Sequence, residues 1–370
     1  MCQLNGMSPE RVTRADAAGT QEMFQGVDFM LGKIFTVFLL YLFCWSLADA
    51  QENIPIISGG AGFLSSTQGG TNVLQPVLAP VLAAPLGDRW LIESRADLRI
   101  VDFQQGPGGP YQNQSFATLE YLQLDYNANS HLTITAGRFL TPFNIYNERI
   151  SPIWISKLQD APYVAAIGTG QGYSDGIMLR GALVATSRYA VNYEAYFSTL
   201  STVNKLTSER GTGGRVSVFV PSTRFELGAS YRKTLQGTRS NAEGVDLTWE
   251  PYQMPLQVRG EWAHSESGFG YWIQASYRFS QMKSETSALG RLEPVFRMQQ
   301  FFRSELNPND SLPTTNAQQP TFGLNYYLPH EIRLNASYGR QFLARDTNTN
   351  VWEFGITYRF LFPLWPGESK

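Results

Sequence analysis

The chain has 370 residues, with 29 Lys and Arg against 31 Asp and Glu, and a formal net charge of −2 at pH 7. Charges of both signs are interspersed, so the sequence offers no basic surface that could follow phosphates, and nucleic acid is excluded as an expected partner. Both cysteines, Cys2 and Cys44, lie within the first fifty residues. The rest of the chain therefore cannot use disulfides, thiolate metal sites or a cysteine nucleophile.

The amino-terminal region is typical of a secretory signal peptide. Lys33 is followed by an apolar run at 34–47 and then by the small-x-small sequence Ala48-Asp49-Ala50. This run is shorter than the roughly 20 residues that a membrane-spanning helix needs. We expect residues 30–50 to be the signal peptide, cleaved before Gln51. Residues 1–29 would precede the true start, and residues 51–370 would form one domain.

Alternation of apolar and polar residues predicts strands along that domain, because a strand turns successive side chains to opposite faces. In residues 188–200, aromatic and aliphatic side chains alternate with Arg188, Asn192 and Glu194. The pattern recurs about fourteen times, and no long window has a helical period. The predicted strands are 89–103, 114–126, 131–139, 174–184, 188–200, 214–220, 224–234, 243–250, 255–264, 270–280, 291–303, 321–328, 330–340 and 351–360.

Residues 59–90 could add one more hairpin and raise the total to sixteen, although Pro76 and Pro80 weaken that prediction. Short and long connections alternate along the chain. The short ones are 127–131, 185–188, 221–224, 250–255 and 329–330, and the long ones are 104–114, 140–173, 199–213, 234–243, 304–320 and 341–350. This alternation is typical of outer-membrane barrels. Residues 280–291 are an exception, because they are too long for the predicted periplasmic side.

The predicted fold class is therefore all-β, a transmembrane antiparallel β-barrel of about 14 to 16 strands formed by residues 51–370. A secreted soluble β-sandwich would show the same alternation and is the alternative fold. The barrel is favoured because aromatic residues lie toward the strand ends and aliphatic residues lie between them, as lipid girdles require. The apolar faces would contact outer-membrane lipid, and the polar faces would contact water inside the barrel.

Residues 135–149, TAGRFLTPFNIYNER, resemble the GRF-x-x-PF segment of the phosphate-selective porin O and P family of Gram-negative outer membranes. The resemblance implies a sixteen-stranded pore, a homotrimer, and a constriction loop formed by the segment after Phe143. It does not extend to phosphate selectivity, because this chain has no evident lysine cluster. The end also departs from the family pattern, since LFPLWPGESK follows Phe360.

Charged residues on the polar strand faces are the candidates for lining a pore. They are Glu93, Arg95, Asp97, Arg99, Arg188, Glu194, Arg224, Glu226, Arg232, Arg278, Arg333 and Arg359. An excess of arginine along a water-filled path would favour anions. Alternatively, these charges pair across strands and only keep the wall hydrated, as the i, i+2 spacing from Glu93 to Arg99 would allow.

Residues 140–173 are too long for a hairpin turn. Within them, Asn144, Arg149, Lys157 and Asp160 are the candidates for a constriction loop. An inward loop that narrows or gates the pore and an outward extracellular loop are both compatible with the sequence.

The three histidines, His131, His264 and His330, have no metal partner at a useful spacing, and no nucleophile elbow accompanies them. We therefore expect neither enzyme activity nor a cofactor. The predicted function is that of an outer-membrane porin through which small hydrophilic solutes diffuse passively, with a mild preference for anions. The alternatives are a substrate-specific anion channel of the phosphate type, and a closed barrel with a structural or surface-binding role.

Overall fold

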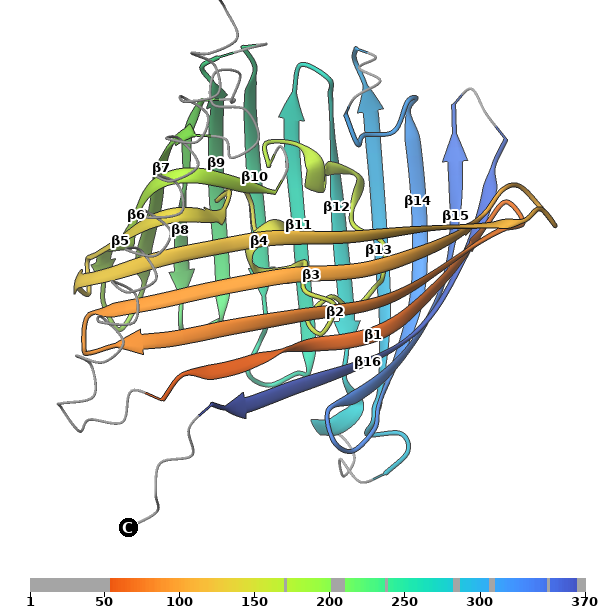
Figure 1. The fold of residues 1–370 in the computed structure, drawn as a ribbon, viewed down its shortest axis with the longest axis horizontal. Coiled ribbons are helices and arrows are strands. Elements are labelled where there is room, and N and C mark those ends of the chain that lie inside the picture. The colour runs from red at the N-terminus through yellow and green to blue at the C-terminus, as the bar shows by residue number, and fades with distance from the viewer. Residues whose placement is uncertain are drawn as a thin grey trace, which may run out of the picture. The chain divides into compact units, whose positions relative to one another are not determined.

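The computed structural model describes residues 54–169, 172–200, 210–236, 239–281, 287–305, 310–344 and 347–364. The predicted signal peptide and residues 1–29 lie outside these ranges. Within them, sixteen strands pair antiparallel with their sequence neighbours, and β1 pairs with β16 to close a barrel (Figure 1). This confirms the predicted fold class at its upper strand number.

The strand bounds follow the chain as β1 Ile56–Gln68, β2 Thr71–Leu86, β3 Trp90–Gln104, β4 Tyr111–Asn129, β5 Leu132–Leu140, β6 Tyr173–Ala185, β7 Ala190–Leu200, β8 Gly211–Val220, β9 Phe225–Thr234, β10 Asn241–Trp249, β11 Leu256–Ser265, β12 Gly268–Tyr277, β13 Leu292–Arg303, β14 Ala317–Tyr327, β15 Ile332–Leu343 and β16 Thr349–Pro363. Three short helical turns accompany them in the described ranges: η2 Tyr146–Ile150, η3 Tyr163–Ala166 and η4 Phe279–Gln281. No helix in the described part of the chain is long and apolar enough to cross a membrane.

The strands are strongly tilted. In Figure 1, β1 to β4 and β16 run across the front, at a steep angle to β7 to β15 behind them. Opposite walls of a barrel cross in this way when each strand tilts relative to the barrel axis.

The first hairpin forms despite its prolines. β1 pairs with β2 through every residue from Ile56 to Gln68. The pairing of β2 with β3, in contrast, is interrupted at residues 75–76 and 79–80. Because proline has no N–H to donate, Pro76 and Pro80 are tolerated where their ring nitrogens face β3, and the hairpin with β1 is preserved.

The connections alternate in length, with exceptions at both ends of the barrel. We call one end the turn end, because it carries the short connections 87–89, 130–131, 186–189, 221–224, 250–255 and 328–331, and the other the loop end. The long connection between β12 and β13, residues 278–291, does lie at the turn end, where it includes η4. At the loop end, residues 69–70 form the turn of the hairpin predicted within 59–90, and residues 266–267 form a tight turn that the sequence did not predict.

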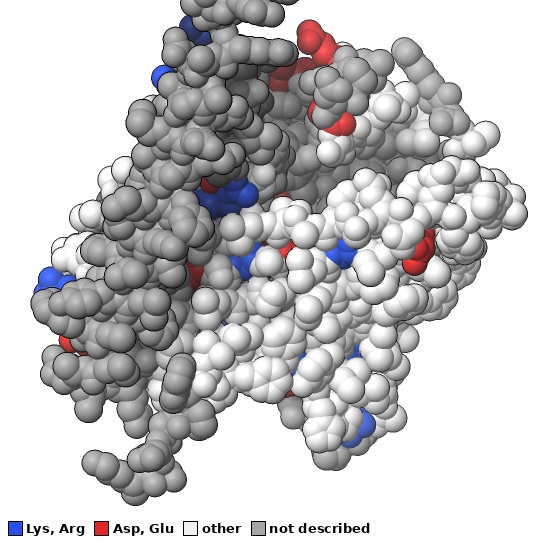
Figure 2. Space-filling view, in the orientation of Figure 1, with Lys and Arg blue, Asp and Glu red and all other residues white. Residues whose placement is uncertain are grey.

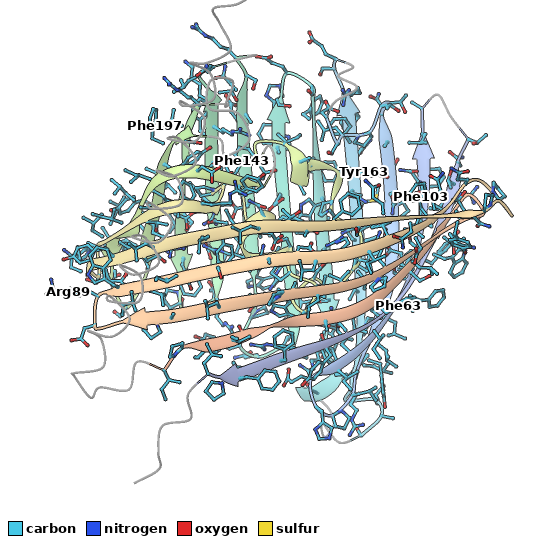
Figure 3. The ribbon with its side chains drawn as sticks, in the orientation of Figure 1. Phe63, Arg89, Phe103, Phe143, Tyr163 and Phe197 are labelled. Carbon is cyan, nitrogen blue, oxygen red and sulfur yellow. The ribbon has the colours of Figure 1, made fainter. Side chains whose placement is uncertain are left out.

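The outer face is apolar. Exposed aromatic side chains lie toward the turn end at Trp90 and Tyr189 and toward the loop end at Phe197 and Trp352, with aliphatic side chains such as Val216 between them. Phe197 lies at the edge of the barrel in Figure 3, and the face presented by β1 to β4 in Figure 2 carries few charged atoms. This distribution is the one that a lipid band with two aromatic girdles requires.

Candidate pore and its inward loop

The connection between β5 and β6, described at residues 141–169 and 172, folds into the barrel, and we call it the inward loop. Its apolar side chains form one buried cluster with residues of β10 to β13. The cluster consists of Phe143, Ile145, Ile150, Val164, Ile167, Ala242, Ala263, Trp272 and Phe301. In Figure 3, Phe143 and Tyr163 lie in the interior of the view, away from its outer edge. Because the loop side chains pack against the barrel wall, the outward-facing alternative is wrong. Burial of each large apolar side chain stabilises the docked loop by about 1.5–3 kcal/mol.

The segment that resembles the phosphate-selective family builds the start of the inward loop. Arg138 on β5 donates from Nε and Nη2 to Asp175 on β6, at 2.9 and 3.2 Å. Its guanidinium also lies 4.1 Å from the ring centroid of Tyr173. Phe139 is fully buried against Met178 and a second aromatic ring on β7. These contacts fix the end of β5 and the beginning of β6, so that the chain between them enters the barrel from a rigid base.

Glu261 on β11 holds the first turn of the inward loop. Its Oε1 accepts the backbone N–H groups of Ile145 at 2.8 Å and of Tyr146 at 2.5 Å. Its Oε2 accepts the indole N–H of Trp272 at 2.9 Å. Glu261 is buried, so these three bonds satisfy donors that would otherwise lose their hydration without a partner.

The candidate loop residues predicted from the sequence all contact the barrel wall. The backbone N–H of Asn144 donates to the hydroxyl of Ser230 at 2.9 Å, and its Nδ2 donates to the carbonyl of Trp262 at 3.4 Å. Arg149 donates from Nη1 to both carboxylate oxygens of Glu226, at 2.9 and 3.0 Å. The first half of the loop is therefore tied to β9 and β11.

The second half of the loop is tied to β12 and β13. Lys157 donates from Nζ to Glu293 at 2.5 Å and to the hydroxyl of Ser276 at 2.6 Å. Burial lowers the pKa of the Lys157 amine, and the neighbouring Glu293 carboxylate offsets part of that effect. The backbone carbonyl of Asp160 accepts a bond from Nη1 of Arg297 at 2.7 Å. The four candidate loop residues thus act first as anchors, and any effect on solutes remains a prediction.

The tip of the inward loop reaches the opposite wall. The carbonyl of Ile153 accepts a bond from Nη2 of Arg333 on β15 at 2.6 Å. The ring of Trp154 lies against Gly60 on β1, where an added Cβ would come within 2.6 Å of Trp154 Cε3. Glycine at this position is therefore what lets the tip rest on β1.

Two cavities lie beside the tip. The first, which we call the tip cavity, has a volume of about 390 Å³ and lies between the loop and the wall formed by β1 to β4, β15 and β16. The second, the turn-end cavity, has a volume of about 410 Å³. Trp154 and Arg333 line both, so these two side chains stand at the junction of the two spaces.

Ion pairs neutralise much of the arginine charge in the tip cavity. Arg95 on β3 pairs with Glu120 on β4. Arg99 pairs with Asp97, two residues before it on the same strand, at 2.5 Å. The charged residues that line this cavity are Arg95, Asp97, Arg99, Glu120, Asp160, Arg333 and Glu353. Three arginines therefore face four acidic residues, and the tip cavity carries no excess of positive charge.

Glu120 is a lining residue that the sequence analysis missed. The register between β3 and β4 shifts at Arg95 and Ala96, which leaves Glu120 as the extra residue of a bulge. A bulge interrupts the strict alternation of faces, so a period of two cannot place the side chain at that position.

The remaining wall candidates lie in different surroundings. Glu93 accepts a bond from Gln123 at 3.1 Å, and Glu226 bridges Arg149 to Arg215. Arg232 donates to the carbonyl of Gly168 in the inward loop at 3.2 Å. Glu226 and Arg232 are thus brought together with the loop, as an inward-facing position requires, whereas Glu93 contacts β4.

Two candidates lie in turns instead of strands. The assignment of Arg188 to a strand was wrong, because Thr186 and Tyr189 close a turn around it and leave it exposed. Arg224 lies in the turn before β9 with φ 50° and pairs with Glu250 at 3.1 Å.

Glu148 of the inward loop lies beside Glu194, a wall candidate on β7. Burial, together with the negative charge of Glu194, raises the pKa of the Glu148 carboxyl well above its usual value. Arg278, Arg333 and Arg359, the last three wall candidates, line the turn-end cavity.

The histidines are dispersed. His131 contacts the carbonyl of Ala182 through Nδ1 at 2.6 Å, and His264 stacks on Trp262. His330 lines the turn-end cavity. In the ranges that the structure describes, no group of three or more His, Cys, Asp or Glu residues is placed to hold a metal ion.

A closed sixteen-stranded barrel with an apolar outer face and a loop folded inside it has the architecture of outer-membrane porins, and solved porin structures match it. OprB of Pseudomonas putida has a TM-score of 0.55 and 10% sequence identity, covering 83% of this chain and 94% of OprB. OmpF of Salmonella typhi has a TM-score of 0.53 and 13% identity, covering 83% and 97%. An anion-selective porin from Comamonas acidovorans has a TM-score of 0.51 and 11% identity, covering 83% and 98%.

No family model and no curated protein matches the chain. At these identities the structural matches show a shared fold alone. The resemblance of residues 135–149 to the phosphate-selective porins therefore stays a prediction.

Proposed function

We propose that this protein is an outer-membrane porin through which small hydrophilic solutes diffuse passively, and not an enzyme. The observation that carries the proposal is the pair of cavities beside the inward loop, which share Trp154 and Arg333 inside a barrel with a polar, charged interior. A solute that passes the loop would cross both cavities, on either side of Trp154 and Arg333. Residues 30–50 would direct export, and a homotrimer is the assembly expected from the family resemblance.

Selectivity at the tip cavity is expected to be weak. Arg95 and Arg99 are both paired there, so neither offers a free positive charge to a passing anion. A mild anion preference would come from arginines without a carboxylate partner elsewhere in the barrel. Arg278, Arg333 and Arg359 line the turn-end cavity, and this favours the second candidate function, a substrate-specific anion channel.

Liposome swelling tests the proposal directly. Residues 51–370 would be refolded in detergent and inserted into liposomes, which are then diluted into isotonic solutions of neutral sugars of increasing mass. We expect rapid swelling with the smallest sugars and a steady decline with size, because the inward loop limits the passage. Liposomes with the heat-denatured protein are the control. Absence of swelling with a folded, heat-modifiable barrel would instead favour the closed structural barrel.

A further inference from the structure

The outer face of the barrel has an apolar groove over β14, β15, β16 and β1, with a volume of about 460 Å³. Ala336 on β15 forms its floor, because this small side chain is flanked in register by Phe354 on β16 and Leu324 on β14. The next outward row toward the turn end, with Leu334 and Ile356, borders the groove on that side. The groove therefore exists because a small residue lies where its neighbours are large.

Two aromatic pairs leave a furrow between β14 and β15 that leads from the groove toward the loop end. In the next outward row, Tyr338 packs on Trp352 of β16 with ring centroids 4.5 Å apart, and its hydroxyl donates to Asn350 at 3.0 Å. Phe322, the partner of Tyr338 on β14, packs on Phe296 of β13 with centroids 4.8 Å apart. The two facing rings are thus each held by the strand on their far side. A chain lying between them would have an aromatic wall on both sides.

Arg340 lies at the loop-end mouth of this furrow. Its neighbour Gln341 faces the lumen, where it donates to Tyr163 of the inward loop at 2.8 Å, so Arg340 points to the outer face. Its side chain is exposed, and its guanidinium lies 5.5 Å from the ring centroid of Phe342. Within the described ranges it forms no ion pair with a carboxylate. An outward arginine is costly at the bilayer midplane and tolerated near the interface, so Arg340 belongs at the level of the lipid head groups.

The separation of Arg340 from the groove matches the dimensions of a lipid. Ala336 lies four residues before Arg340, which is roughly 13 Å along the strand at about 3.3 Å per residue. At a strand tilt of about 45° this separation corresponds to about 9 Å of depth, within the roughly 15 Å of hydrocarbon in one leaflet. A lipid whose head group meets Arg340 would therefore place an acyl chain over Ala336.

We propose that this outer face binds an acylated lipid of the loop-end leaflet, with a phosphate of its head group on Arg340 and one acyl chain in the furrow and groove. Arginine suits this role because its guanidinium donates two parallel N–H bonds to phosphate oxygens. The exposed Asn350, opposite Arg340 on β16, adds an amide at the same level. A second copy of the chain would have to supply both a carboxylate and a long apolar side chain, whereas a lipid carries both parts in one molecule.

Native mass spectrometry of residues 51–370, folded in a nonionic detergent, tests the site. The barrel would be titrated with dipalmitoyl phosphatidic acid, which carries a phosphate and two acyl chains, and separately with dipalmitoyl glycerol, which has the same chains and no phosphate. We expect one phosphatidic acid molecule to bind at a lower concentration than further copies. Dipalmitoyl glycerol should bind about fivefold more weakly, because it lacks the contact with a basic residue.

Two variants separate the head-group contact from the chain contact. Arg340→Gln should weaken the binding of phosphatidic acid about fivefold, the contribution of one basic residue near an anionic lipid surface, and should leave dipalmitoyl glycerol unchanged. Ala336→Phe should fill the groove and weaken the binding of both lipids about tenfold, the effect of exposing about two methylenes of the chain. Heat-modifiable migration on gels checks that each variant is folded.

Lys233→Gln and Val216→Phe are the matched controls. Lys233 is an exposed basic residue at the loop end of β9, Val216 is an exposed outward residue of β8, and neither lines the groove. Both should leave lipid binding within about twofold, the range of ordinary surface substitutions. Equal losses in the controls, or unchanged binding in Arg340→Gln and Ala336→Phe, overturn the site.

Other occupants of the groove would give different results in the same experiment. If inorganic phosphate at the same concentration displaces phosphatidic acid from the wild type, the chain contributes nothing and the lipid assignment is wrong. If the wild type is an oligomer that Ala336→Phe splits into monomers while lipid binding stays the same, the groove is a contact between copies and the proposal is also wrong. The measurement needs no current, so failure of the proposed channel function leaves this test intact.

Discussion

Replacing Glu261 with alanine would release the first turn of the inward loop from the barrel wall. Three donors lose their acceptor: the backbone N–H groups of Ile145 and Tyr146, and the indole of Trp272. Each buried donor left without a partner costs about 1–3 kcal/mol, and water from the lumen replaces part of the lost bonding, so we expect a net loss of about 3 kcal/mol. That loss shifts the equilibrium between docked and undocked loop by about a hundredfold.

The change should appear in single-channel recordings as larger or noisier conductance, because the loop no longer holds its place across the lumen. The barrel itself should still form, since its ladders do not depend on Glu261, and heat-modifiable migration on gels checks this. Glu243→Ala is the matched control, because Glu243 lies on the neighbouring strand with an exposed side chain. If E261A conducts with the same amplitude and noise as the wild type, the reasoning about how the loop is held is refuted.

Three further predictions concern the same loop. Phe143→Ala removes the largest loop side chain from the buried cluster and should cost about 3–5 kcal/mol of docking free energy, measured as faster proteolysis of the loop in folded barrels. Gly60→Val should displace Trp154 from β1, because even a Cβ would approach its ring within 2.6 Å, and unchanged conductance would contradict this contact. The pKa of Glu148 is raised in the docked loop, so docking takes up a proton. Docking is therefore strongest below the usual value of 4.5 and weakens as pH rises through the raised pKa. Weaker docking should appear as open-channel noise that rises with pH, and Glu148→Gln should remove this pH dependence. If the noise of the wild type instead falls as pH rises, the claim that docking takes up a proton is wrong.

Much of the fold could be predicted from alternation, because most strands have one apolar face against lipid and one polar face against the lumen. Prediction failed where that pattern breaks locally. The proline-rich β2 pairs fully on one side only, and Glu120 enters the lumen through a bulge that a period of two cannot represent. Arg188 has the spacing of a strand residue but lies in a turn, since a sequence pattern does not mark where pairing begins.

The candidate site could be predicted in part. The length of residues 140–173 indicated a special loop, but its direction depends on long-range contacts such as the one between Lys157 and Glu293. A signal for that direction was present in Phe143, Ile145 and Ile150, since apolar side chains in an extracellular loop would remain in water. The pairing of arginines could not be deduced, because it depends on which strands lie side by side.

Single-channel current across a planar bilayer containing residues 51–370 tests the central claim most directly. The account predicts steady open steps from the wild-type barrel, with a reversal potential in a salt gradient near zero or mildly biased toward anions. A folded, heat-modifiable barrel that gives no steps over the full voltage range would contradict the claim that solutes pass beside the inward loop.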